Sequence, residues 1–289
     1  MELVQALLSG VLVGGVYGLF AMGFSLAFGV MRIVNFAHGE LVMIGMYVGF
    51  FAFSLAGIDP LLAVPVALVL VGALGAGLYR LIYRRFVGRA TLQQLLVAIA
   101  LALVLQTLAQ ILVGPDAHAV QSGWGSRFLL IGPIFLPYAE LAAFAVALVC
   151  VVGIELLLGR WRWGQMIRAV ADDPEIAELV GMNAQRVNIV AFALSAGLAG
   201  LAGAVLVMMY YPVSPVVGAT LMPIALIATV LGGLGSIGGA FIGGILCGIV
   251  EQVTSLFWNA ALQDVPLYVL LLVIMAFLPQ GLFGRQSAH

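Results

Sequence analysis

Charged side chains, the groups most able to do chemistry or to bind a partner, gather in one segment of this chain. Eight of them fall within residues 159–187, although only 8% of the whole chain is charged. They are Arg160, Arg162, Arg168, Asp172, Asp173, Glu175, Glu178 and Arg186. Because charged side chains are almost never fully buried without a partner, this segment is expected to be a loop in water.

A short helix is predicted inside this loop, beginning at Pro174. Asp173 can cap it, and proline suits the first helical position, where a missing N–H costs nothing. Glu175 and Glu178 favour the positive N-terminal end of a helix, and Gly181 suits the left-handed position that ends one. About two turns of helix are not stable alone in water, so the segment needs a surface to pack against.

The helix, residues 174–180, has an apolar face that something must cover. Ile176, Leu179 and Val180 lie on that face, since positions three and four apart are neighbours on a helix. The helix could lie flat on lipid headgroups, or it could dock onto a partner protein. The acidic residues around it disfavour contact with anionic lipid, so docking is the favoured interpretation.

The other reactive side chains form no catalytic or metal-binding set. All 11 basic residues are arginine, so the lysine of a G-x-x-x-x-G-K-[ST] phosphate-binding loop is missing. Cys150 and Cys247 stand alone in apolar runs, as buried free cysteines do, and the three histidines are far apart in sequence. We expect no ATP hydrolysis by this chain, no catalytic residue, no metal and no cofactor.

The composition indicates which elements carry these residues. The chain is 64% apolar with a mean hydropathy of +1.21, whereas a soluble domain is about half apolar and about a quarter charged. At about 20 apolar residues per crossing, the length allows eight or nine membrane spans. We expect an all-α, polytopic transmembrane bundle in which residues 1–289 form one domain. The net charge of −1 gives no sign of a nucleic-acid partner.

Breaks in the apolar pattern locate the spans. They are expected at about residues 3–30, 37–56, 61–79, 92–113, 138–158, 188–210, 219–258 and 266–279. The run 219–258 contains a glycine-rich break at 232–239, so it counts as two spans. Half-helices there, or a first segment that folds back, would make the total eight rather than nine.

The arginines predict the orientation of the spans, because short cytoplasmic loops accumulate basic residues. Alternation of the spans places all but one of them on one side, with Arg127 opposite. The side with the ten other arginines is therefore the cytoplasmic one, and it carries Arg32, Arg80, Arg84, Arg85, Arg89, Arg160, Arg162, Arg168, Arg186 and Arg285. The C-terminus is therefore expected in the cytoplasm.

Polar residues occur where the second span begins. Asn35 and His38 could line a water-filled path, since intramembrane polar groups face the protein interior or a cavity. They could equally satisfy backbone groups where the first helix ends. Glu40 is expected near the headgroups.

Glycines in the run 232–239 permit either a broken helix that lines a path or close helix packing. Packing is the favoured role of Gly235, Gly239 and Gly243, which are spaced four apart. The same spacing occurs at Gly10, Gly14 and Gly18.

Several stretches resemble a known family. Glu175-Ile176-Ala177, followed by Gly181 after three residues, resembles the E-A-A-x-x-x-G core through which permeases of ABC importers contact their ATPases. The I-x-L-P that follows this core in many permeases is absent here. Residues 30–40, 179–183, 196–203 and 232–240 are similar to branched-chain amino acid permeases of the LivH type.

This resemblance implies a permease subunit in a bacterial inner membrane that transports branched-chain or other hydrophobic amino acids. It implies a second, related permease as a heterodimer partner, two ATPase subunits that hydrolyse ATP, and an extracytoplasmic binding protein. The residues expected to couple to the ATPases are Arg168, Asp172, Asp173, Pro174, Glu175, Ala177, Glu178 and Gly181. The residues assigned to the substrate path are Asn35, His38, Gly232, Gly233, Gly235 and Ser236.

Three alternatives stay open at this point. A related ABC permease would carry urea, amides or aromatic acids. An ion-coupled secondary transporter would need paired intramembrane acids, for which Glu155 and Glu251 are the candidates. A passive channel would not need the capped helix at Pro174.

Overall fold

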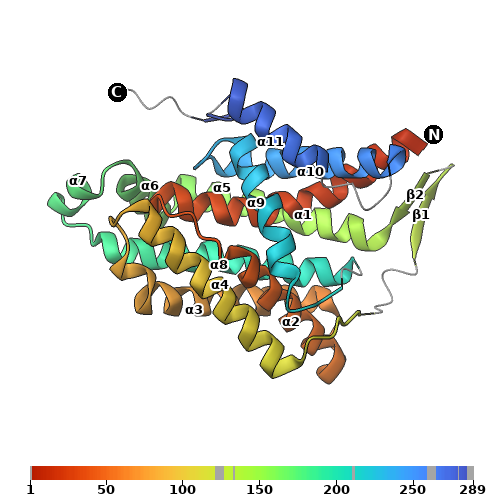
Figure 1. Ribbon diagram of the computed structural model, residues 1–289, viewed down its shortest axis with the longest axis horizontal. Helices are drawn as coiled ribbons and strands as arrows, with labels where there is room; N and C mark the ends of the chain where they lie inside the picture. The colour runs from red at the N-terminus through yellow and green to blue at the C-terminus, as the bar shows by residue number, and fades with distance from the viewer. Residues whose placement is uncertain are drawn as a thin grey trace.

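The computed structural model describes residues 2–120, 127–132, 134–209, 212–258, 265–278 and 280–284. Within these ranges the chain is a helical bundle with one small β-hairpin (Figure 1). Its elements are α1 (Glu2–Met31), α2 (His38–Ala56), α3 (Pro60–Leu81), the 3-10 turn η1 (Tyr83–Arg85), α4 (Thr91–Val113), β1 (Phe128–Ile131), β2 (Ile134–Pro137), α5 (Tyr138–Arg160), α6 (Arg162–Asp172), α7 (Pro174–Leu179), α8 (Ala184–Met208), α9 (Val217–Gly232), α10 (Ile237–Phe257) and α11 (Val265–Phe277).

The predicted polytopic helical bundle is confirmed. Among the described helices, seven are long and apolar enough to cross a bilayer, namely α1, α2, α3, α4, α5, α8 and α10. Two more apolar helices are shorter: α9 has 16 residues and α11 has 13. The expected run 219–258 is therefore two helices, divided at the glycine-rich break.

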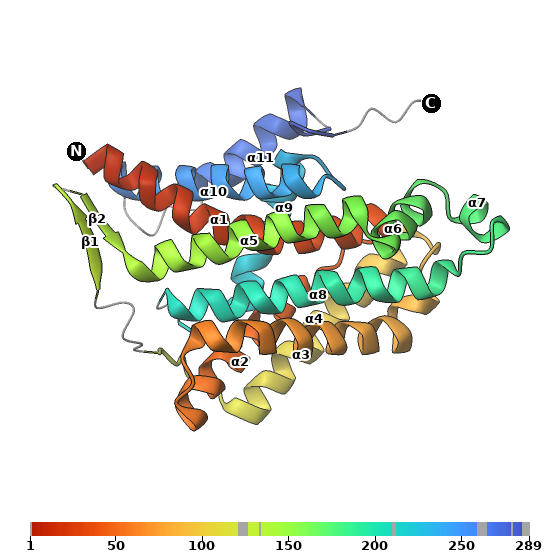
Figure 2. The same ribbon diagram turned by 180° about the vertical axis from the view of Figure 1, so that it is seen from behind.

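Helices α1 and α8 form the centre of the bundle. In their most apolar 18-residue windows, 83% of α1 and 78% of α8 is buried, against 11% of α4 and 22% of α5. Figure 2 shows α5 and α8 running lengthwise beside α1, with α3 below α8. The outer faces of α4 and α5 are consequently available to lipid or to other subunits.

Glycines let the central helices approach closely, as their spacing predicts. A Cβ on Gly10 would lie 2.7 Å from Cα of Ile249, and one on Gly18 would lie 2.6 Å from the carbonyl oxygen of Phe241. Helices α1 and α10 therefore pack backbone to backbone in antiparallel directions. Gly45 of α2 leaves no room for a side chain against α8 in the same way.

The hairpin β1–β2 was not predicted from the sequence, which indicated only a polar stretch over 114–137. The two strands pair antiparallel, with Leu129 opposite Leu136. The side-chain amide of Gln5 in α1 hydrogen-bonds both the carbonyl and the N–H of Phe135, so the hairpin is attached to the first turns of α1.

Candidate functional site

The capped helix forms where the sequence predicts it. Oδ1 of Asp173 accepts from the backbone N–H groups of Glu175 (2.9 Å) and Ile176 (3.0 Å), with Pro174 at the first position. Gly181 takes a left-handed φ of 87° just beyond the helix. The helix, α7, is one residue shorter than predicted because Val180 is its C-cap.

Helix α7 exposes its apolar face. Ile176 is 60%, Leu179 86% and Val180 67% exposed, whereas Ala177 is buried. Both views show α7 projecting beyond the rest of the bundle at the end opposite the N-terminus (Figures 1 and 2). This chain alone therefore leaves the face uncovered.

Helix α6 connects α7 to the bundle. Ile167 and Val170 on its inner face are each 2% exposed, and Gly164 packs against the backbone of Leu157 and Leu158 in α5. Helix α6 also contacts α1 and α8. A displacement of α7 would therefore be transmitted to three helices of the bundle.

The charged residues of the coupling set lie around this connection. Arg168 on α6 reaches the carbonyl oxygen of Gly159 at 3.4 Å, and Asp172 ends α6. Glu175 and Glu178 are exposed on α7 beside the apolar face. The structure thus brings all eight residues of the predicted coupling set into one segment at one end of the bundle.

A second set of polar residues lies in the interior, at the connection between α1 and α2. Asn35 is 1% exposed, and its Oδ1 accepts from the Ala37 N–H at 3.1 Å and from the Tyr83 hydroxyl. His38 is fully buried, with its Nε2 2.9 Å from the carbonyl oxygen of Phe20. Both side chains therefore satisfy neighbouring groups, which is one of the two roles the sequence left open.

These residues also retain unused hydrogen-bonding capacity. Asn35 Nδ2 and His38 Nδ1 are buried with no hydrogen-bond partner within the described chain. Leaving such a group unpaired in a low-dielectric interior is costly, so an unpaired group suggests a further partner.

Glu40, which the sequence places near the headgroups, is buried inside the bundle. It is only 3% exposed, and its Oε2 has no hydrogen-bond partner in the described chain. The carboxylate lies on Gly218 in the first turn of α9, and Gly39 packs against the carbonyl of the same glycine. The signal in the sequence was an acidic residue within an apolar run, which is costly and usually functional.

The first turns of α2 and α9 thus meet inside the bundle. Neither helix has a side-chain cap at its N-terminus, where Ala37 and Val216 stand. Helix N-termini carry partial positive charge, so two of them converge near the Glu40 carboxylate. Figure 1 shows α9 crossing α1 rather than running beside it, and Thr229 of α9 donates to the carbonyl oxygen of Ala21 at 3.2 Å.

The glycine-rich run is a tight turn between two helices. Gly233 and Gly235 adopt φ values of 100° and 86°, which only glycine takes readily. Ser236 caps α10 by accepting from the Gly239 N–H at 3.2 Å. Ser25 of α1 donates to the carbonyl of Ser236 at 3.2 Å, so the turn packs near the end of α1.

The predicted path residues therefore fall in two places. Asn35 and His38 lie in the interior beside Glu40, whereas Gly232, Gly233, Gly235 and Ser236 lie at the far end of α9. Helix α9 connects the two places, since it begins against Glu40 and ends at Gly232.

The intramembrane acids that an ion-coupled transporter would need are not neighbours. Glu155 of α5 lies against the start of α10, with its Oε1 3.2 Å from where a Cβ of Gly238 would be. Glu251 is thirteen residues further along that helix, about 20 Å away at 1.5 Å per residue. The described residues also contain no group of three or more His, Cys, Asp and Glu that could hold a metal ion.

Comparisons with known proteins agree along the whole chain. A family model described as branched-chain amino acid transport system / permease component matches residues 6–275. The high-affinity branched-chain amino acid transport system permease protein BraD of Pseudomonas aeruginosa is 31% identical, over 99% of this chain and 97% of its own length. LivH of Escherichia coli strain K12, which bears the same description, is 31% identical over 99% and 96%. The probable LivH of Methanocaldococcus jannaschii is 29% identical over 84% and 78%. No solved structure matches the chain.

Proposed function

The chain belongs to the family of branched-chain amino acid transport permease components, and on that premise we propose that it forms the membrane path of an ATP-driven importer for branched-chain or other hydrophobic amino acids. Its relatives BraD and LivH are named as permeases of high-affinity branched-chain amino acid transport. In this proposal, two separate ATPase subunits bind and hydrolyse ATP, and this subunit converts their motion into alternating access.

The observation that carries the proposal is the uncovered apolar face of α7. Ile176, Leu179 and Val180 are exposed on a helix that α6 fastens to α1, α5 and α8. A buried anchor with an exposed apolar tip is what a helix docked in a groove of another protein requires. Each ATPase would receive one such helix, with Glu175 and Glu178 at the rim of the contact.

The remaining partners follow from the surfaces of the bundle. A second, related permease would pair with this chain through the exposed apolar faces of its outer helices. An extracytoplasmic binding protein would deliver substrate to the end opposite α7. The arginines on η1, α6 and the neighbouring helix ends support a cytoplasmic location of the α7 end. We therefore place the protein in a bacterial inner membrane with its C-terminus in the cytoplasm.

We place the polar part of the substrate path at the junction of α2 and α9. The Glu40 carboxylate would accept the ammonium group of the amino acid, with Asn35 and His38 beside it. Discontinuous helices whose N-termini meet at a buried site are a recurrent way for transporters to bind charged substrates. The turn over Gly232, Gly233, Gly235 and Ser236 would let α9 move relative to α10.

A paired substitution tests the docking role of α7. Leu179→Glu places a charge on its exposed face, and Leu55→Glu does the same at an 82% exposed leucine in the last turn of α2, at the other end of the bundle. We expect Leu179→Glu to abolish both co-purification of the ATPase subunits and leucine uptake, while Leu55→Glu preserves both. Retention of the ATPases by the Leu179 variant would refute the docking role.

A further inference from the structure

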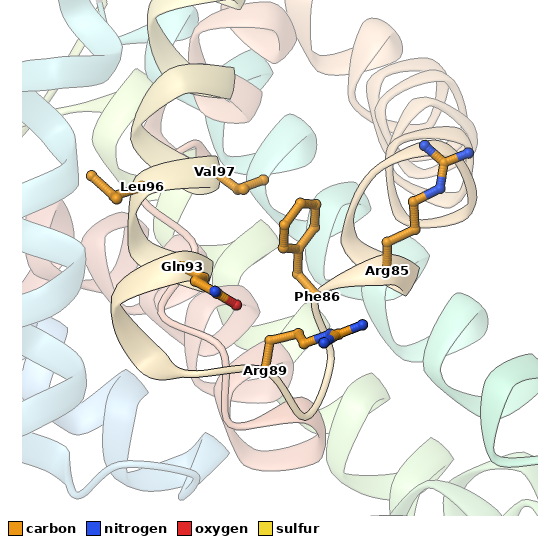
Figure 3. Close-up of a pocket in the computed structure, with 6 residues that line it drawn as sticks. All are labelled: Arg85, Phe86, Arg89, Gln93, Leu96 and Val97. Carbon is orange, nitrogen blue, oxygen red and sulfur yellow. The ribbon is translucent and has the colours of Figure 1, made fainter.

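A shallow pocket of about 450 Å³ lies between η1 and the first turns of α4. Arg85, Phe86, Arg89, Gln93, Leu96 and Val97 line it. Figure 3 shows the Phe86 ring between Val97 on α4 and Arg85 on η1, with the Arg89 guanidinium below the ring. Because α3 and α8 run antiparallel, η1 lies at the same end of the bundle as α6 and α7 (Figure 2).

The segment that carries Arg85 and Arg89 is held in place by hydrogen bonds to α4 and to the interior of the bundle. The Gln94 side chain donates to the carbonyl oxygens of Phe86 and Arg89, both at 3.1 Å. Tyr83, at the start of η1, is 1% exposed and donates to Asn35 in the interior. The backbone of the pocket is therefore held in place without a ligand, which lowers the entropic cost of binding.

The pocket carries positive charge that nothing in the described chain neutralises. Residues 60–115 contain four arginines and no acidic residue. Within the described ranges, Arg85 and Arg89 have neither a hydrogen-bond partner nor an ion-pair partner for their guanidinium groups. Two guanidinium groups on one turn suit the oxygens of a phosphate, to which arginine binds in bidentate geometry.

An exposed apolar stripe continues from the pocket along α4. Leu92, Leu96, Ile99 and Leu103 lie on one face of this helix and are 65%, 57%, 38% and 58% exposed. Free phosphate would leave this stripe uncovered, and a water-soluble subunit could not follow it, because α4 is a membrane span. A second permease packed on this face would be labelled as protein in the crosslinking experiment. An acyl chain attached to a phosphate would cover both parts.

We propose that this pocket binds an anionic phospholipid, with the phosphate of its headgroup between Arg85 and Arg89 and an acyl chain along α4. Basic pockets at the ends of membrane helices are suited to anionic headgroups. The site is independent of the substrate, because it lies on the outer side of α4 rather than at the junction of α2 and α9.

Lipid retention by the assembled transporter tests this site. The complex, released from vesicles of phosphatidylcholine and phosphatidylglycerol, is analysed by native mass spectrometry. We expect the wild type to retain phosphatidylglycerol, and the double variant Arg85→Gln/Arg89→Gln to bind it about 30-fold more weakly, from about 1 kcal/mol per arginine. The matched control is Arg84→Gln, which removes an exposed arginine of the same turn that does not line the pocket.

Several outcomes would overturn the proposal. They are equal retention of phosphatidylcholine by the wild type, full retention of phosphatidylglycerol by the double variant, and an equal loss in the control. Displacement of the lipid by inorganic phosphate alone would assign the pocket to the free anion. A photo-crosslinking residue at Leu96, in an otherwise unchanged chain, should label lipid; labelling of a protein subunit instead would contradict the proposal. None of these readouts depends on amino acid uptake, so a failure of the proposed function would be seen separately.

Discussion

The carboxylate of Glu40 lies flat against Gly218: a Cβ on that glycine would be 2.6 Å from Oε2 and 2.8 Å from Oε1. Glu40 is in the first turn of α2 and Gly218 in the first turn of α9, so the contact joins two helices that are far apart in sequence. It places an acidic side chain inside a membrane protein, beside two helix N-termini.

Gly218→Ala is expected to disrupt this contact. The added methyl group must displace the carboxylate or the start of α9, and overpacking of this kind costs about 1–3 kcal/mol. Thermal unfolding of the purified complex should occur at a lower temperature, and uptake should fall. Gly77→Ala in α3 is the control, since its Cβ would meet no atom within 4 Å. Equal behaviour of the two variants would show that the contact has no role.

Glu40→Gln keeps the shape of the side chain and removes its charge. If the carboxylate binds the substrate ammonium, a hydrogen bond worth about 1.5–3 kcal/mol is weakened, and uptake should fall by about 10- to 100-fold. The complex should still assemble, because the amide fits the same space. The exposed Glu2→Gln serves as the control. Uptake by the Glu40 variant at the wild-type rate would exclude this role.

Asp173→Ala removes the cap of α7. The N–H groups of Glu175 and Ile176 lose their acceptor, which costs about 0.5–2 kcal/mol of helix stability. A helix of six residues should then fray, and the ATP hydrolysis of the assembled complex should respond less to substrate. Asp173→Asn is the matched control, because asparagine caps as well as aspartate. A defect of equal size in both variants would point to the charge rather than to the cap.

Tyr83→Phe removes the hydrogen bond from η1 to Asn35. Oδ1 of Asn35 keeps its bond from Ala37, so the expected loss is about 0.5–1.5 kcal/mol of stability. The midpoint of thermal unfolding measures it. Tyr138→Phe, at a tyrosine that is 38% exposed, should leave the midpoint unchanged. A larger loss from Tyr138 than from Tyr83 would contradict the importance of this link.

Features set by neighbouring residues could be predicted from the sequence. The cap at Asp173, the proline after it and the glycine at 181 are all within one short segment, and α7 forms where they indicate. The long apolar helices follow from the length of apolar runs, and the division between α9 and α10 follows from clustered glycines.

Features set by distant contacts could not be predicted. The sequence indicated only that Glu40 lies near the headgroups, whereas the packing of α9 against α1 and α2 buries it. The hairpin at 128–137 was missed because two four-residue strands are too short to show a pattern against an apolar background. Asn35 and His38 also depend on distant contacts, with Tyr83 and Phe20, so the sequence could not separate their backbone role from a path role.

The burial of α1 has a consequence for how the protein is made. Helix α1 is synthesised well before α8 and α10, yet it packs against both. At about 5–20 residues per second, α1 waits about 10–45 seconds between its own synthesis and that of α10. During that interval the face of α1 that carries Gly10, Gly14 and Gly18 lacks α10, the helix against which it packs in the bundle. An 18-residue window of α1 has a mean hydropathy of 1.9, which favours insertion of the helix by itself, so a polar substitution there would act at insertion, before α10 is available.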